Sequence, residues 1–220
     1  MTSITVNTPQ PAISRTHGLA IKQERGRITY DALINAGFRM LEESELQDIS
    51  IADLTREAGY SVGAFYARFR SKDEFFDALM ARHIEIRTVM QKQLFAAQPI
   101  DTLMPDMVSN LVGYYWQHRK FWRAVLVRSV RDPEFWEPIR QQGNALCARF
   151  ISRVRNELGR DLSEVETGNI EFAFRVVLGT INSTILHQRG PVFTGQEPYV
   201  KELTRTFRLV SSYDRLLSDG

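Results

Sequence analysis

The chain has 220 residues, of which 43% are hydrophobic and 25% are charged, and its formal net charge is +2 at neutral pH. This composition is ordinary for a globular protein, with enough material for one small and one larger domain. No apolar run reaches about 18 residues, so we expect no membrane span. The single cysteine, Cys147, excludes an internal disulfide and fits a reducing cytoplasm, and the amino terminus lacks the pattern of a secretory signal.

The first segment of the chain, residues 1–24, contains Pro9, Pro11 and Gly18 among many serines and threonines. We expect this segment to be a mostly disordered tail. Apolar residues at helical spacing then predict a first helix over about 25–43.

Two short helices separated by a glycine are predicted next. Ser50 precedes an apolar run and Asp53 follows three residues later, which predicts a capping box at a helix start. Gly59 stands where a helix ends in a left-handed residue. Ser61 then caps a second short helix over about 62–69. This arrangement has the spacing of a DNA-binding helix-turn-helix.

A longer helix follows the helix-turn-helix. Ser71 and Glu74 form a second capping box, which starts a helix expected over about 72–95. Pro99 ends that region.

The rest of the chain repeats signals for the start and the end of helices. Asp132 and Pro133 are a cap followed by proline at the first helical position, Gly159 is a stop signal, and Ser163 with Glu166 is a further capping box. The expected helices lie at about 106–118, 121–131, 132–158, 164–189 and from about 198 onward.

The sequence therefore predicts an all-α protein with about nine helices. Gly190 and Pro191 are expected to end the helix that starts after Ser163, and no alternating strand pattern extends beyond a few residues. We expect a tail (1–24), a three-helix DNA-binding domain (25–71) and a larger C-terminal helical domain for effector binding and dimerisation (72–220).

Residues 27–79 resemble the TetR family of bacterial transcriptional regulators. The matching residues are Ser50, Ile51, Ala58, Gly59, Ser61, Gly63, Phe65, Tyr66, Phe69, Lys72 and Asp73. The departures from the family's pattern are Thr55, Tyr60, Ala64 and Arg68. The resemblance implies N-terminal domains that read a double-stranded DNA operator, and C-terminal domains that form a homodimer and hold a small-molecule effector.

The resemblance also implies that Tyr66 and Lys72 contact DNA phosphates; alternatively, Tyr66 packs inside the small domain and Lys72 is a solvated helix start. Val62, Gly63 and Ala64 open the recognition helix. Their small surfaces suit close approach to a groove and contact with a thymine methyl, or they simply form a tight helix start. The candidate DNA-binding residues are Ser50, Ser61, Val62, Gly63, Ala64, Tyr66, Arg68 and Lys72.

The charge is distributed unevenly around this motif. Arg68, Arg70 and Lys72 follow one another without an acid between them. A local basic footprint of this kind suits DNA phosphates even when the whole chain is nearly neutral. Arg68 either contacts a DNA base or phosphate, or is a free arginine on the protein surface.

A second candidate site lies in the aromatic region between residues 114 and 136. These rings either line a ligand cavity between helices or form ordinary core. The candidate ligand-binding residues are Trp116, His118, Trp122, Phe174 and Asn182. An apolar cavity with few polar groups suits a small hydrophobic or aromatic effector. We expect no metal site, because His83 and Glu85 lack further ligands at suitable spacing.

These features predict a ligand-responsive, dimeric, sequence-specific DNA-binding regulator in the cytoplasm, a repressor released by a small hydrophobic molecule. No cofactor is expected. One alternative is a helical protein-interaction module that has lost DNA binding, which the Ala64 departure leaves open. An enzyme is a weaker alternative, because the sequence has no Gly-rich phosphate loop, G-x-S-x-G or HExxH motif. The low net charge argues against a sequence-neutral DNA architectural protein.

Overall fold

A computed structural model describes residues 13–187 and 196–218, with side chains described from residue 23 onward. These residues form ten α-helices and two short 3₁₀ helices, and no strand, so the all-α prediction is confirmed for the described part of the chain. The elements are α1 (Ile13–Glu43), η1 (Leu46–Asp48), α2 (Ile51–Ala58), α3 (Val62–Tyr66), α4 (Lys72–Ala97), α5 (Ile100–Gln117), α6 (Arg119–Arg131), η2 (Glu134–Trp136), α7 (Glu137–Leu158), α8 (Glu164–His187), α9 (Gln196–Ser211) and α10 (Tyr213–Ser218).

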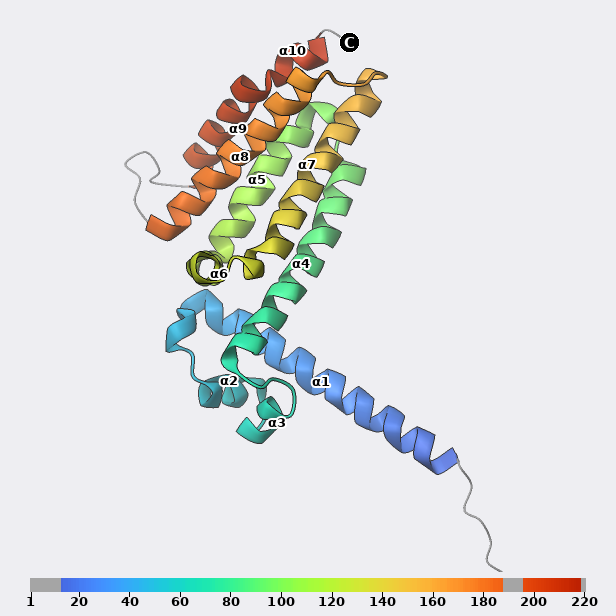
Figure 1. Ribbon diagram of the computed structural model, residues 1–220, viewed down its shortest axis with the longest axis vertical. Helices are drawn as coiled ribbons and strands as arrows, with labels where there is room; N and C mark the ends of the chain where they lie inside the picture. Colours follow the sequence, from blue (N-terminus) through green and yellow to red (C-terminus); the bar gives the residue numbers. More distant parts are fainter. Residues whose placement is uncertain (1–12, 188–195, 219–220) are drawn as a thin grey trace, which may run out of the picture.

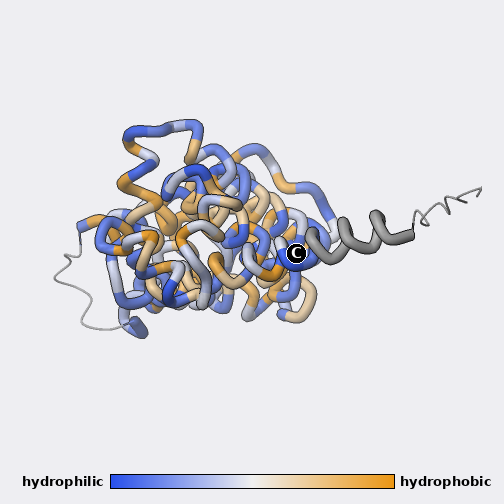
Figure 2. Tube along the Cα trace, turned by 90° about the horizontal axis from the view of Figure 1, so that it is seen from below, coloured by the Kyte–Doolittle hydropathy of each residue, from blue (hydrophilic) through white to orange (hydrophobic). Residues whose placement is uncertain are grey.

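The helices form a small domain at one end of an elongated bundle. Helices α1, α2 and α3 lie at the lower end of the molecule, and α5, α7, α8 and α9 run roughly side by side above them (Figure 1). Helix α4 begins in the small domain and continues along the bundle, while α6 lies across the junction. Hydrophobic and hydrophilic residues alternate along the helices, as amphipathic packing requires (Figure 2).

The serine caps predicted in the small domain are confirmed, although the Glu74 carboxylate accepts the N–H of Arg70 rather than that of Ser71. The Ser50 hydroxyl accepts the Asp53 N–H at 3.0 Å, and Ser71 accepts the Glu74 N–H at 3.1 Å. Gly59 has a φ of 76°, the left-handed conformation that ends α2. The turn between α2 and α3 is therefore determined by side chains within a few residues of it.

Two helix starts differ from the prediction. Helix α1 begins at Ile13 rather than about Arg25, so residues 13–24 belong to this helix rather than to a disordered tail. No proline follows Pro11 in that stretch, and the residues just before Arg25 favour helix. Helix α5 begins at Ile100 and includes Pro105, although the missing proline N–H costs one helical bond. Burial of Ile100 and its neighbours offsets that loss.

Two helix ends also differ. Helix α3 ends at Tyr66 rather than at Phe69, because the Arg68 N–H bonds the Phe65 carbonyl three residues back and interrupts the α-helical ladder. At the other end of the chain, Ser212 has a φ of 53° and separates α10 from α9 where one last helix was predicted. The predicted stop at 190–191 lies outside the described residues.

The helix after Asp132 and Pro133 is also divided. The Asp132 carboxylate accepts the Phe135 N–H at 3.2 Å, so the predicted cap is present. It starts the 3₁₀ turn η2, and α7 follows from Glu137. Gly159, with a φ of 62°, ends α7 as predicted.

A single hydrophobic core connects the small domain to the bundle. At the junction, the Phe121 ring of α6 lies 5.8 Å from Phe38 of α1 and 5.6 Å from Phe76 of α4, measured between centroids. A displacement of α4 or α6 would therefore also displace α1, because closely packed side chains transmit strain.

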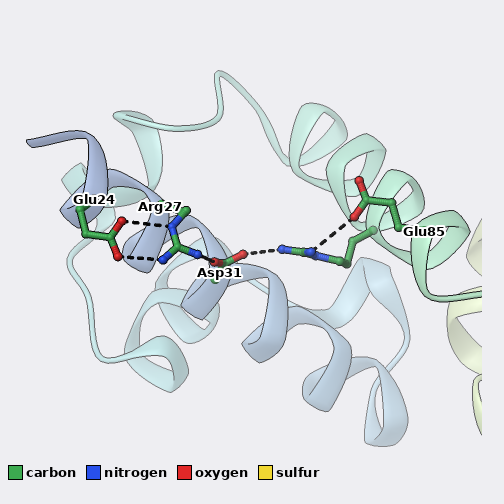
Figure 3. A network of polar contacts seen from close by, with 5 residues as sticks. Glu24, Arg27, Asp31 and Glu85 are labelled. Atoms are coloured by element: carbon green, nitrogen blue, oxygen red, sulfur yellow. Dashed lines mark hydrogen bonds and ion pairs between the residues drawn. The ribbon is translucent and has the colours of Figure 1, made fainter. Parts of the chain in front are cut away.

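A chain of ion pairs adds a polar connection between α1 and α4 (Figure 3). Arg27 pairs with Glu24 at 2.7 Å and with Asp31 at 3.8 Å. Asp31 also pairs with Arg82 of α4, which reaches Glu85 at 3.4 Å. Partly exposed pairs contribute little stability individually, so the network mainly fixes the orientation of α1 relative to α4.

Candidate nucleic-acid interface and ligand cavity

Helix α3 buries one side and presents the other to solvent. Phe65 is completely buried, with its ring 5.3 Å from Phe69 and 5.6 Å from Phe75. On the opposite side, Val62 is 42% exposed and Tyr66 is 55% exposed. Tyr66 meets the Phe65 ring edge-on, and more than half of its surface remains available to an outside partner.

The start of α3 has free space in front of it, where a groove of DNA could come close. Ser61 caps the helix by accepting the Ala64 N–H at 3.2 Å. A Cβ atom added to Gly63 would meet only the Ser61 Oγ, at an ordinary 3.7 Å. The fold itself therefore does not require glycine at position 63, and any need for it comes from a partner outside the domain.

Ser50 and Lys72 lie together at a small crevice between α1, α2 and α4. Lys72 is half-buried, and its Nζ lies 3.5 Å from the Gln47 carbonyl. Desolvation lowers the pKa of Lys72, although the carboxylates of Asp48 and Asp73 act in the opposite direction. This ammonium sits at the N-terminus of α4 and beside that of α2, a combination that favours an anion.

Of the two arginines in the basic cluster, Arg68 is tethered and Arg70 is not. The Arg68 Nε donates to the Gly26 carbonyl of α1 at 3.2 Å, and its Nη1 donates to the Ala67 carbonyl at 3.1 Å. Arg70 is exposed, and its guanidinium has no hydrogen-bond or ion-pair partner in the described part of the chain. The sequence placed Arg70 in the basic cluster but not among the candidate DNA-binding residues.

A cavity of about 680 Å³ lies between α4, α5, α6, α7 and α8. Three of the five candidate ligand-binding residues line it: Trp122, Phe174 and Asn182. The other two do not. Trp116 is 45% exposed on the last turn of α5, and the adjacent residue Tyr115 lines the cavity instead, stacked on Trp122 at 4.4 Å.

His118 packs beside the cavity wall rather than on it. Its ring lies 4.5 Å from Tyr114 and 6.5 Å from His83. Burial lowers the pKa of His118. The helix-end geometry explains this placement, because α5 ends at Gln117 and His118 starts the turn into α6.

Helix α4 contributes a stripe of buried polar side chains at intervals of four residues. His83, Arg87 and Gln91 are 0%, 2% and 4% exposed. Arg87 and Gln91 line the cavity, and the sequence prediction missed both. The signal was present, since these three residues continue the apolar stripe of Phe76 and Met80 at helical spacing.

Several polar atoms around the cavity are buried without a partner in the described part of the chain. They include the Asn182 Oδ1 and the Trp122 Nε1, and the Nε2 of His83 behind the wall. The His83 Nδ1 is 2.7 Å from the Tyr114 hydroxyl. Burial keeps the pKa of His83 well below its usual value, with the Arg87 charge acting in the same direction. Unsatisfied buried polar atoms are costly, so the two on the wall are atoms that a bound polar group would stabilise.

Two further residues, Cys147 on the cavity wall and the exposed Glu85 of α4, have ordinary structural surroundings. Burial raises the pKa of Cys147 to about 12, which keeps the thiol protonated and unreactive. Glu85 points to Arg82 rather than to His83. Within residues 23–187 and 196–218, no three His, Cys, Asp or Glu side chains gather at one point, and none of the described helices is long and apolar enough to cross a bilayer.

Helix α6 joins the cavity wall to the small domain. It carries Trp122, and its Lys120 Nζ donates to the Glu43 carbonyl at the end of α1. Arg123 pairs with Glu45 at 3.3 Å. Together with α4, which extends from Lys72 to the cavity, α6 gives the cavity two direct mechanical connections to the helix-turn-helix.

Known proteins share both the motif and the fold. The family described as "Bacterial regulatory proteins, tetR family" matches residues 33–79. The uncharacterized HTH-type transcriptional regulator YwcC of Bacillus subtilis (strain 168) is 38% identical over 100 residues, which cover 42% of this chain and 45% of YwcC. The chain thus matches less than half the length of that relative.

Solved structures extend the similarity to the whole fold. A putative TetR-family regulator from Mesorhizobium loti is 16% identical, with a TM-score of 0.64 over 89% of this chain and 98% of its own. FadR from Bacillus subtilis, in complex with stearoyl-CoA, is 13% identical, with a TM-score of 0.59 over 84% of this chain and 98% of its own. Residues 33–79 thus match the tetR family of bacterial regulatory proteins, and the chain has the fold of these solved structures.

Proposed function

We propose that the protein is a cytoplasmic, sequence-specific DNA-binding transcriptional regulator whose affinity for an operator is controlled by a small ligand. The observation that carries this proposal is the open face of α3, where Val62, Gly63 and Tyr66 are available beside a fully packed core. The similarity to YwcC, an HTH-type transcriptional regulator, supports it.

In this proposal α3 enters the major groove of the operator. Val62, Gly63 and Ala64 approach base edges closely, because they have little side-chain bulk. Phosphate contacts come from Tyr66 and the Lys72 ammonium, with the hydroxyls of Ser50 and Ser61 at the helix starts. Arg70, which lacks an internal partner, contributes another phosphate contact, whereas Arg68 mainly holds α3 against α1.

We propose that a homodimer brings two such helices to a palindromic operator. Helices α8 and α9 form the outer layer of the bundle on one side (Figure 1). They leave large apolar side chains exposed: Val165 at 72%, Phe172 at 59% and Leu209 at 70%. A two-fold interface over this face suits a two-fold symmetric DNA site.

The dimer is tested by sedimentation of Phe172→Arg. A charge in the centre of the interface should shift the protein to the monomer and weaken operator binding. Val130→Arg is the matched control, because Val130 is 79% exposed and belongs to α6 rather than to α8 or α9. A wild-type monomer that binds the operator fully would exclude the dimer.

A ligand in the 680 Å³ cavity would act on DNA binding through α4 and α6. The fifteen helical steps from Lys72 to Arg87 correspond to about 22 Å of helix. A shift at the cavity would change the separation of the two α3 helices in a dimer. A hundredfold loss of affinity requires a coupling free energy of about 2.7 kcal/mol, which is a normal value. Release of a repressor is the direction we propose.

Genome-wide footprinting followed by titration of the recovered site tests the DNA-binding role. Gly63→Leu should abolish specific binding without unfolding the domain, because position 63 has space for a side chain in the free protein. Lys72→Ala should reduce the salt slope by about one, whereas Lys92→Ala, an exposed lysine farther along α4, should not. If no specific site is recovered, or if Gly63→Leu binds normally, the proposal is wrong. The first outcome would favour a protein-interaction module.

A further inference from the structure

The cavity contains a buried cation without a counter-charge. Arg87 is only 2% exposed, and none of the carboxylates in the described part of the chain pairs with it. Its two partners are neutral: the Nη1 donates to the Asn110 Oδ1 at 3.0 Å, and the guanidinium carbon lies 4.1 Å from the centre of the Tyr114 ring. A buried charge is costly unless it is paired, so the protein's own neutral groups stabilise the Arg87 charge incompletely.

The edge of the Arg87 guanidinium that carries Nε and Nη2 is arranged to bind a carboxylate. With the Nη1 engaged by Asn110, the Nε and Nη2 have no protein acceptor in residues 23–187 and 196–218. Those two nitrogens form the parallel pair of donors that binds both oxygens of a carboxylate. The Trp122 Nε1, buried on the same cavity, is another donor without an acceptor.

The remaining charges of the cavity do not compensate Arg87. Arg140 lines the cavity but is paired with Glu137. Arg175 and Glu171 are exposed residues of α8. The cavity lining therefore contains three arginines and one glutamate, and the only arginine that is both buried and without a carboxylate is Arg87.

We infer that the ligand of this cavity is an amphipathic carboxylate, whose acid group binds Arg87 and whose hydrocarbon or aromatic body contacts the apolar wall. Four residues represent that wall: Leu111, Leu146, Ile151 and Phe174. A neutral hydrocarbon would leave Arg87 unpaired, and a nucleotide would need more than one buried cation for its phosphates. The inference rests on the proposed function, in which this cavity holds the effector.

Matched pairs of an acid and its alcohol test the inference on the free protein. The probes are dodecanoic acid with 1-dodecanol, and naphthalen-2-ylacetic acid with 2-(naphthalen-2-yl)ethanol, titrated by calorimetry and by Trp fluorescence at neutral pH. At least one acid should bind about tenfold or more tightly than its alcohol, as expected for a charge-assisted pair. Arg87→Met should abolish this preference, and Arg140→Met, an arginine already paired on the same cavity, should retain it.

Three results would overturn the inference: equal affinity of acid and alcohol for the wild-type protein, an acid preference that survives in Arg87→Met, or no binding of either acid. The first and third come from wild-type protein alone, so the test stands even if Arg87→Met does not fold. Because no DNA is present, a failed acid titration leaves operator binding intact. Loss of operator binding with an intact acid preference would instead contradict the proposed regulation.

Discussion

The polar groups of the small domain and those of the cavity differ in whether they have hydrogen-bond partners within the protein. In the small domain, caps such as Ser50 and tethers such as Arg68 meet partners inside the protein. Around the cavity, the free edge of Arg87, the Trp122 Nε1 and the Asn182 Oδ1 have no partner in the described part of the chain. Satisfied groups fix a shape, whereas unsatisfied buried groups are expected to be completed by a ligand. The difference teaches that the surface which we propose to face DNA is preformed, whereas the cavity, in our proposal, is completed by its ligand.

The largest effect is expected from damage to the preformed region. Phe65→Ala removes a completely buried ring that contacts two other phenylalanines of the small domain. The free energy of unfolding should fall by about 3–5 kcal/mol, measured by urea denaturation. Val130→Ala, at a position 79% exposed, should change it by less than about 0.5 kcal/mol. A loss below about 1 kcal/mol for Phe65→Ala would show that the small domain is loosely packed.

The next effect concerns His83 behind the cavity wall. Its folded-state pKa is depressed well below 6.5 by burial and by the charges of Arg87 and His118. When the pH falls below 6.5, the unfolded chain binds a proton at this residue and the folded protein does not, so stability is lost. His83 can lower the free energy of unfolding by at most about 1.4 kcal/mol for each pH unit below 6.5. Well above pH 6.5 it contributes no pH dependence.

His83→Gln should therefore flatten the loss of stability between about pH 6.5 and 5, measured as the midpoint of thermal unfolding. Wild type and variant should converge in slope above pH 7. Identical pH profiles over the whole range would mean that His83 titrates normally in the folded protein.

A smaller effect compares two glycines, Gly59 in the small domain and Gly159 at the end of α7. Gly59 and Gly159 have φ angles of 76° and 62°, and a Cβ atom at either would contact nothing within 4 Å. Replacing either glycine by alanine should lower the free energy of unfolding by about 1 kcal/mol, through backbone strain alone. Only Gly59→Ala should also weaken operator binding, because it alters the turn between α2 and α3. Gly168→Ala, in the interior of α8, should stabilise the protein slightly. Equal operator affinity for both variants would contradict the role of that turn.

The smallest change in stability is expected at Arg87, in the region that we consider incomplete. Arg87→Met removes a buried charge whose partners among the described residues are Asn110 and Tyr114. The free energy of unfolding without ligand should change by less than about 1 kcal/mol, or rise. A loss above about 2 kcal/mol in urea denaturation would identify Arg87 as a structural residue and would weaken the contrast between the two regions.

The sequence predicted the small domain well because its signals are local. The caps at Ser50, Ser61 and Ser71 and the glycine at position 59 each act within a few residues, and each lies where the spacing predicts. The end of α3 was misplaced, because the Arg68 N–H bonds the Phe65 carbonyl, three residues back rather than four. The spacing of apolar residues in the sequence does not reveal such a change.

The cavity was predicted only in part because it is assembled from five helices. Aromatic density correctly indicated Trp122 and Phe174 but also suggested Trp116, whose neighbour Tyr115 faces inward. One residue rotates a helix by about 100°, so composition alone cannot distinguish the two. Arg87 was missed because a charged residue is normally assigned to a solvated face. Its position on the stripe of Phe76, Met80 and His83 was the available evidence.

The most direct test of the account is the affinity of the protein for its footprinted operator, measured with and without a carboxylate that binds the cavity. Without ligand, wild type and Arg87→Met should bind the operator equally, since Arg87 lies about 22 Å along α4 from the DNA-facing end. Saturating ligand should weaken wild-type binding about a hundredfold and leave Arg87→Met unchanged. A carboxylate that fills the cavity of the wild-type protein without altering its operator affinity would contradict the account.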